Sequence, residues 1–158
     1  MRIISIDPGY ERLGIAIIEK EKTGKETYLF SECFRTSKDE PHAKRLALIQ
    51  EELKTIIETW RPTNLAIETL FLNANQKTAM SVAESRGVIL ATASGSGLKV
   101  FEYSPPQIKS AVCGDGKADK KSIIKMVPLL IKVPPQVKID DEFDAIAIGL
   151  TFFAIERL

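Results

Sequence analysis

Three segments with the character of β-strands occupy the first 35 residues of the chain. They run over residues 2–6, 13–19 and 27–35, and only a short turn and a polar stretch separate them. Strands joined by such short connections pair with one another as an antiparallel meander. The start of the chain therefore predicts one half of a β-sheet before any helix begins.

The remainder of the chain alternates between helical and strand patterns. Short apolar strands are expected over 65–67 and 99–103. Helices are expected, in chain order, over 41–60, 76–94 and 105–112, from about 118, and over 141–156. Pro128 lies inside the fourth helical pattern and should kink or shorten that helix. This order predicts an α/β fold with a mixed five-stranded sheet flanked by helices.

Length and composition restrict the class of protein. A chain of 158 residues suits a single domain over residues 1–158, and its contents of 44% hydrophobic and 27% charged residues are typical of globular proteins. No apolar stretch is long enough to cross a bilayer, and a strand that begins at residue 2 leaves no room for a signal peptide. We therefore expect a cytoplasmic protein that does not bind membranes.

Charge is unevenly distributed although the net charge is only +1. Seven lysines and two aspartates lie between Pro105 and Lys138, and residues 140–144 then contain four acids in five positions. A basic segment beside an acidic one suits a site that holds both phosphate and cations. Lysines on an ordinary solvated helix are the commoner cause of such a basic segment.

Two of the strand patterns end on an acidic residue. Asp7 follows the apolar segment 2–6 and precedes Pro8-Gly9, and Glu68 follows the strand at 65–67. A carboxylate at the end of a buried strand needs a basic side chain, backbone donors or a metal ion as its partner. Asp7 taken alone is equally compatible with an ordinary turn residue.

The last helical pattern begins with two further acids. Asp141 and Asp144 are three residues apart, so they share one face of the first helical turn. The residues that follow are apolar on nearly every side, which predicts a buried helix that supports this turn. Asp140 or Asp141 is also compatible with a plain N-cap.

The four acids Asp7, Glu68, Asp141 and Asp144 together indicate a metal site. His42 stands alone, and the two cysteines lie in no metal-binding motif and are expected to be reduced thiols. Oxygen ligands without histidine or cysteine select Mg²⁺ or Mn²⁺. Four carboxylates can flank two such ions, which activate water and stabilise the leaving oxygen in phosphodiester hydrolysis.

Several sequence blocks also have the order and spacing of a known family. These blocks are Ile6–Gly9, Ala66–Phe71, Ser85–Val88, Tyr103–Pro105, Gly114–Lys120 and Asp141–Ile148. On these motifs the sequence resembles the RuvC Holliday junction resolvases, which are metal-dependent endonucleases with the ribonuclease-H-like fold. The resemblance runs over almost the whole chain.

The resemblance implies roles for individual residues. Asp7, Glu68, Asp141 and Asp144 match the catalytic acids, which bind two Mg²⁺ ions per subunit with Mn²⁺ as a possible substitute. Lys120 and Lys109 match basic positions near the scissile strand, where Lys120 would stabilise the transition state and Lys109 would position the DNA backbone.

Three further residues are candidates for contact with DNA. Phe71 matches an aromatic position that engages unpaired bases, although an aromatic residue after a strand is more often part of the core. Lys117 and Arg12 are candidates for phosphate contacts.

The resemblance also implies partners and products. The family acts as a homodimer that nicks two strands of like polarity in a four-way DNA junction, leaves 5′-phosphate and 3′-hydroxyl ends, and cooperates with the branch-migration complex of the Ruv system. Its role is in homologous recombination and DNA repair. The helix expected over 76–94 has small residues suited to the dimer contact. Glu142 replaces a small residue of the family pattern and could attract a third cation or face solvent, of which we expect the second.

Two other functions remain open on the sequence alone. Asp7-Pro8-Gly9 with Gly14 also resembles the phosphate loop of actin-like ATPases, but those proteins need two such domains. The second alternative is a module that binds DNA junctions without cutting them, or a related nuclease that acts on other branched DNA. The intact set of four acids argues against the loss of cutting.

Overall fold

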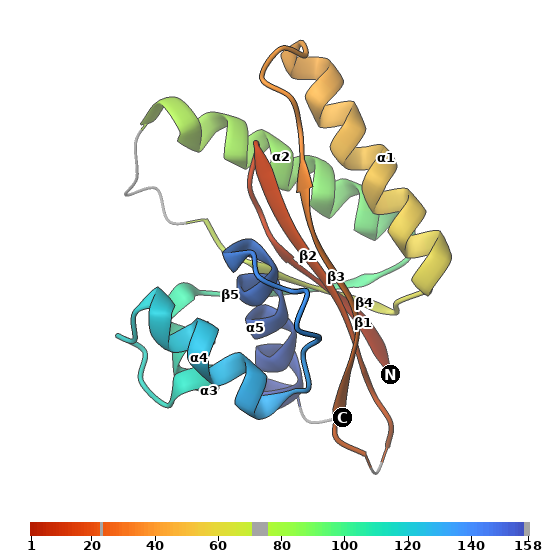
Figure 1. Cartoon of the computed structure of the whole chain (residues 1–158). Coiled ribbons are helices and arrows are strands. Elements are labelled where there is room, and N and C mark those ends of the chain that lie inside the picture. The colour runs from red at the N-terminus through yellow and green to blue at the C-terminus, as the bar shows by residue number, and fades with distance from the viewer. Residues whose placement is uncertain (23, 71–75, 157–158) are drawn as a thin grey trace.

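The computed structural model describes residues 1–22, 24–70 and 76–156, with residues 76–78 described by their backbone only. A single five-stranded sheet forms the centre of the molecule (Figure 1). Its strands are β1 (Arg2–Asp7), β2 (Arg12–Lys20), β3 (Glu26–Arg35), β4 (Asn64–Glu68) and β5 (Lys99–Tyr103). Each predicted strand is present, and its bounds differ from the prediction by no more than a residue at either end.

The sheet is mixed, with the strand order β3-β2-β1-β4-β5. The first three strands form the predicted antiparallel meander, in which Asp7 lies opposite Gly14. β4 and β5 then add in parallel on the other side of β1, with Ile6 opposite Ile67. β1 is the central strand, and its residues Ile3, Ile4 and Ile6 are fully buried in the cores on the two faces of the sheet.

Helices cover both faces of the sheet and give three layers (Figure 1). The helices are α1 (His42–Trp60), α2 (Gln76–Gly95), α3 (Pro105–Cys113), α4 (Lys120–Leu130) and α5 (Asp140–Ile155). Buried residues of α1 and α2 share one hydrophobic core with one face of the sheet, and buried residues of α3, α4 and α5 share a second core with the other face. None of these helices, within the described residues, has the length and apolar character needed to cross a membrane.

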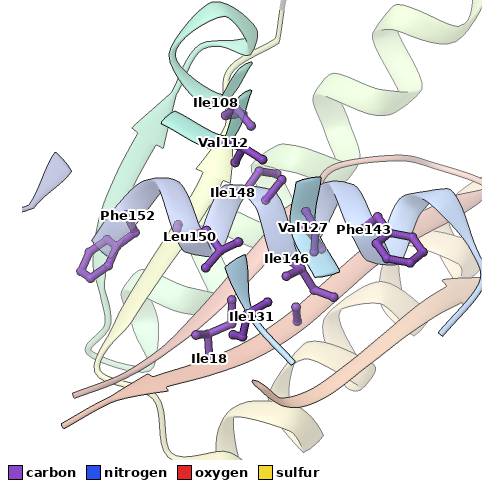
Figure 2. Packing of buried hydrophobic residues seen from close by; sticks show 14 of the residues in the cluster. Ile18, Ile108, Val112, Val127, Ile131, Phe143, Ile146, Ile148, Leu150 and Phe152 are labelled. Carbon is purple, nitrogen blue, oxygen red and sulfur yellow. The ribbon is translucent and has the colours of Figure 1, made fainter. Parts of the chain in front are cut away.

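Among the helices on its face of the sheet, α3, α4 and α5, helix α5 is the most buried. Figure 2 shows its side chains Ile146, Ile148 and Leu150 packed in one cluster with Ile108 of α3 and Val127 of α4. The helix lies directly on β1 and β2. A Cβ atom added at Gly149 would lie only 2.8 Å from Ser5 Oγ and 2.7 Å from Ile18 Cδ1. The sequence predicted this burial, and the first turn of α5 consequently starts from a rigid support.

Helix α4 differs from its prediction in two details. It begins at Lys120 and not near Ala118, because Asp119 acts as the N-cap and accepts a hydrogen bond of 2.8 Å from the Ser122 backbone N–H. Pro128 lies inside the helix, and the helix ends two residues later at Leu130. Pro128 has no backbone N–H, so the helix loses one hydrogen bond. The loss falls in the last turn, close to the residue at which the helix ends.

Candidate active site

Asp7 is the last residue of the central strand β1 and is half-buried. The chain turns away at once through Pro8-Gly9, where a side chain at Gly9 would overlap the backbone carbonyl of Arg12. Ser85 of α2 holds this turn from the other layer by donating a hydrogen bond of 2.7 Å to the Gly9 carbonyl oxygen. Asp7 therefore lies at the end of a strand whose backbone is held in place by neighbouring segments on several sides.

Glu68 ends the neighbouring strand β4 at the same edge of the sheet as Asp7, because β1 and β4 run parallel. Arg86 of α2 donates a hydrogen bond of 3.2 Å to the Glu68 backbone carbonyl and also pairs with Glu102 of β5. A further bond of 2.9 Å from the Thr69 N–H to the Tyr103 carbonyl continues the β4–β5 pairing past Glu68. These contacts fix the backbone from which the Glu68 side chain projects.

The first turn of α5 brings its acids to this edge. Gly14 of β2 lies against the backbone of Asp141, so that any side chain at position 14 would collide with the Asp141 carbonyl. Glycine thus allows the start of the helix to lie in direct contact with the sheet. Ile139 is the N-cap and makes no side-chain capping bond, so the N-cap interpretation of Asp140 or Asp141 is wrong.

An open cleft of about 330 Å³ lies where these elements meet. It is lined by Asp7, Glu68, Asp144, Lys109, Lys120, Pro105, Ile108 and Ile123. Three of the four predicted catalytic acids, together with Lys109 and Lys120, therefore face one cavity. Within it the Lys120 ammonium lies 2.8 Å from an oxygen of Asp144, and it also lies 3.3 Å from Asp140.

Burial and mutual repulsion change the acidity of these carboxyl groups. Burial, followed by the nearby charges of Asp144 and Glu68, raises the pKa of Asp7 to about 8. Burial and Asp144 raise the pKa of Glu68 to about 7, although Lys109 and Lys120 act in the opposite direction. Burial likewise raises the pKa of Asp144, against the pull of Lys120. The ionised form of a carboxyl group that is buried among other acids is stabilised by any added cation.

The donor set fits Mg²⁺ or Mn²⁺ in its chemistry, because every candidate ligand is a carboxylate oxygen. The described residues contain no group of three or more His, Cys, Asp or Glu side chains already arranged to hold an ion. Asp141 does not line the cleft and pairs with the guanidinium of Arg12. A ligand set that includes all four acids would require the Asp141 side chain to turn toward the cleft.

The other predicted DNA contacts are distributed around this cleft. Lys109 and Lys120 line it, whereas Arg12 lies beyond Asp141 and reaches Asp140 at 3.8 Å. Lys117 is exposed in the loop between α3 and α4 and does not line the cleft. Phe71 lies outside the described residues.

Glu142 is not solvent-facing, so that expectation is wrong. Only 7% of this residue is exposed, and it accepts a hydrogen bond of 2.7 Å from the Ser31 hydroxyl of β3. The first turn of α5 packs against β2 and β3, and one of its four acids therefore points into the protein. The helical pattern alone does not reveal which side of this turn meets β3.

Gly14, Ser85 and Arg86 support the site although the sequence assigned them no part in it. A glycine inside a strand pattern signals close approach of another backbone, so Gly14 could have been found on that ground. Ser85 and Arg86 act on backbone carbonyls of distant segments, Gly9 and Glu68, which no local pattern predicts.

The chain is similar in sequence to one family of proteins over most of its length. Residues 3–152 match the family described as "Crossover junction endodeoxyribonuclease RuvC". The protein of that name from Moorella thermoacetica is 39% identical over 150 residues, which cover 95% of this chain and 89% of the relative. The one from Desulfitobacterium hafniense is 41% identical over 153 residues, covering 95% of this chain and 90% of the relative.

Solved structures show the same fold. Thermus thermophilus RuvC in complex with a Holliday junction substrate superposes with a TM-score of 0.89 at 29% identity, covering 97% of this chain and 93% of that chain. The yeast mitochondrial Holliday junction resolvase has a TM-score of 0.73 at 12% identity, covering 96% of this chain and 77% of that one, and supports the fold alone. The predicted ribonuclease-H-like fold is thereby confirmed. The chain belongs to the RuvC family of crossover junction endodeoxyribonucleases.

Proposed function

We propose that the protein resolves four-way DNA junctions by metal-dependent nicking of two strands of like polarity, in homologous recombination and DNA repair. Its relatives are named crossover junction endodeoxyribonucleases, and the similar Thermus thermophilus structure contains a Holliday junction substrate. The observation that carries the proposal is the cleft in which Asp7, Glu68 and Asp144 meet Lys109 and Lys120. Acids that hold cations beside lysines that attract phosphate are the combination that phosphodiester hydrolysis needs.

The carboxylates of Asp7, Glu68, Asp141 and Asp144 would hold two Mg²⁺ ions. When bound, such ions supply an activated water and charge stabilisation for the leaving oxygen. Hydrolysis as a whole joins a water oxygen to phosphorus, breaks the bond from phosphorus to the 3′ oxygen, and passes one proton of that water to the 3′ oxygen. The products are a 5′-phosphate and a 3′-hydroxyl.

The lysines would act on the substrate itself. Lys120 is close enough to Asp144 to lie beside the reacting phosphate, where its ammonium would donate to a non-bridging oxygen as negative charge develops. Lys109 faces the same cleft from α3 and would hold a phosphate of the scissile strand in register. Lys117 lies further out and would add to the attraction for the DNA backbone.

A homodimer and the branch-migration complex of the Ruv system are the proposed protein partners. A four-way junction has approximate two-fold symmetry, and a two-fold dimer offers two active sites in matching orientation. Helix α2 exposes Met80, Ala83 and Gly87 along one side, with open space around Gly87. We propose this side as the dimer contact and residues 1–158 as one nuclease domain.

The test uses a synthetic mobile four-way junction and a linear duplex of the same sequences, each incubated with the purified protein and Mg²⁺. We expect paired nicks at symmetric positions in two strands of the junction, ends that a ligase can rejoin, and an intact duplex. Equal cutting of the duplex would contradict junction selectivity. Junction binding without any nick, in Mg²⁺ or Mn²⁺, would support a binding module in place of a nuclease.

A further inference from the structure

Arg12 stands apart from the other cations near the site because it contacts the one predicted catalytic acid that does not line the cleft. Its guanidinium pairs with Asp141 Oδ2 and reaches Asp140 Oδ1 at 3.8 Å. The thiol of Cys33, on β3, lies 3.8 Å from the same Asp141 oxygen. Contacts from β2 and β3 thus hold the Asp141 carboxylate beside the cleft.

The backbone of Asp141 is fixed independently of this pair. It lies against Gly14, which faces it across the contact between α5 and β2. The helix is also anchored by its buried apolar residues, of which Ala145, Ile146 and Ala147 are fully buried. Because α5 is held against the sheet, the position of the Asp141 carboxylate relative to the cleft is set by the rotation of its side chain.

The partner of Asp141 is accessible to a competing anion. The Arg12 side chain is 41% exposed, whereas that of Asp141 beneath it is 17% exposed. A guanidinium binds phosphate with the same planar fork that it presents to a carboxylate. A DNA phosphate that arrives at this rim can therefore take over the guanidinium from Asp141.

We infer that Arg12 is a positioning residue that holds Asp141 out of the metal-binding set until a DNA phosphate draws the guanidinium away. This inference rests on the proposed function of the cleft. Loss of the pair frees the Asp141 carboxylate to turn toward Asp7 and Asp144, and binding of DNA and binding of the divalent ion then strengthen each other. Lys120 differs, because it lies within the cleft beside Asp144 and remains next to the reacting phosphate.

The direct test measures Mn²⁺ binding to the DNA-free protein by calorimetry. The proteins are the wild type, Arg12→Gln, Asp141→Asn and the double variant. We expect Arg12→Gln to bind Mn²⁺ about two- to fivefold more tightly, which corresponds to the loss of a partly exposed ion pair. In the Asp141→Asn background the same change should have no effect, because the competition is for that carboxylate.

Two results would overturn the inference. Unchanged or weaker Mn²⁺ binding by Arg12→Gln means that the pair does not compete with the ion. If Arg12→Gln strengthens Mn²⁺ binding equally with and without the Asp141 carboxylate, Arg12 acts only through long-range charge. Lys38→Gln is the matched control, since it removes a charge that is 76% exposed and, within the described part of the chain, forms an ion pair with Glu11 alone, and it should leave Mn²⁺ binding unchanged.

The phosphate contact is tested with junction DNA in Ca²⁺. For Arg12→Gln we expect the slope of log affinity against log salt to be smaller by about one, as for the loss of one phosphate contact. An unchanged slope would contradict the exchange of Arg12 onto DNA. Because the Mn²⁺ cycle contains neither DNA nor cleavage, a protein that fails to cut junctions would overturn the proposed function and leave the Arg12–Asp141 result standing.

Discussion

Carboxyl groups in this protein are placed where a charge is costly, and the consequences differ from residue to residue. Asp7 and Glu68 face a cleft in which a cation can offset their raised pKa values of about 8 and about 7. Glu32 lies on the edge strand β3, and one oxygen of its carboxyl group is buried without a hydrogen-bond partner among the residues that the structure describes. Burial, followed by its neighbours Glu52 and Glu142, raises the pKa of Glu32 to about 7.

Glu32 should make the folded state less stable as the pH rises. In the unfolded chain its pKa returns to 4.5, so the folded state binds the extra proton between that value and about 7. The free energy of unfolding is therefore highest below the unfolded pKa of Glu32, and it decreases as the pH rises through the folded pKa. Glu32→Gln should therefore raise the free energy of unfolding at pH 8 by on the order of 1 kcal/mol, and by much less at pH 4.5.

Urea denaturation at both pH values measures this difference. Glu58→Gln is the control, because Glu58 is an exposed acid on helix α1. Its effect at each pH value is the baseline against which the effect of Glu32→Gln is compared. A Glu32→Gln protein that gains no more at pH 8 than at pH 4.5 would show that Glu32 titrates as an ordinary carboxyl group.

Secondary-structure elements were largely predictable from periodicity, because strands and helices in this chain have clear apolar patterns. The two acidic strand ends were also predictable as neighbours, since parallel strands bring their carboxyl ends to one edge. The direction of the Glu142 side chain and the pairing of Arg12 with Asp141 were not predictable. Both depend on how α5 contacts β2 and β3, which lie more than a hundred residues away in the sequence.

Helix α5 must lie close to the sheet if its acids are to reach the cleft, and Gly149 is one position that makes this possible. Gly149→Ala should destabilise the fold by about 1 kcal/mol, since overpacking against Ser5 and Ile18 outweighs the gain in helix propensity. Thermal unfolding should show a decrease in Tm of about 2–4 °C for a chain of this size. Gly95→Ala, at the end of α2 with nothing near its Cβ position, is the control and should not lower Tm. An unchanged Tm for Gly149→Ala would mean that α5 can move away from the sheet without cost.

In the molecule as a whole, the helices on the two faces of the sheet contribute differently to the site. On one face α1 and α2 build a core and hold the backbones of Gly9 and Glu68 through Ser85 and Arg86. On the other face α3, α4 and α5 bring Lys109, Lys120 and Asp144 to the same edge. The cleft therefore combines groups from both layers around the end of β1. Binding of DNA and cutting of DNA should consequently be separable by changes at that single point.

The most direct test of this account is Asp7→Asn, assayed for junction binding in Ca²⁺ and for junction nicking in Mg²⁺. The substitution replaces a carboxyl group whose ionised form is disfavoured by burial and by neighbouring acids, so thermal stability should not fall. We predict junction affinity within a factor of about two of the wild type, because lysines and not Asp7 attract phosphate. Nicking should fall by at least about a hundredfold, while the exposed-acid control Asp39→Asn should cut normally. A folded Asp7→Asn protein that nicks junctions at the wild-type rate would contradict the central claim that this carboxylate holds the catalytic metal.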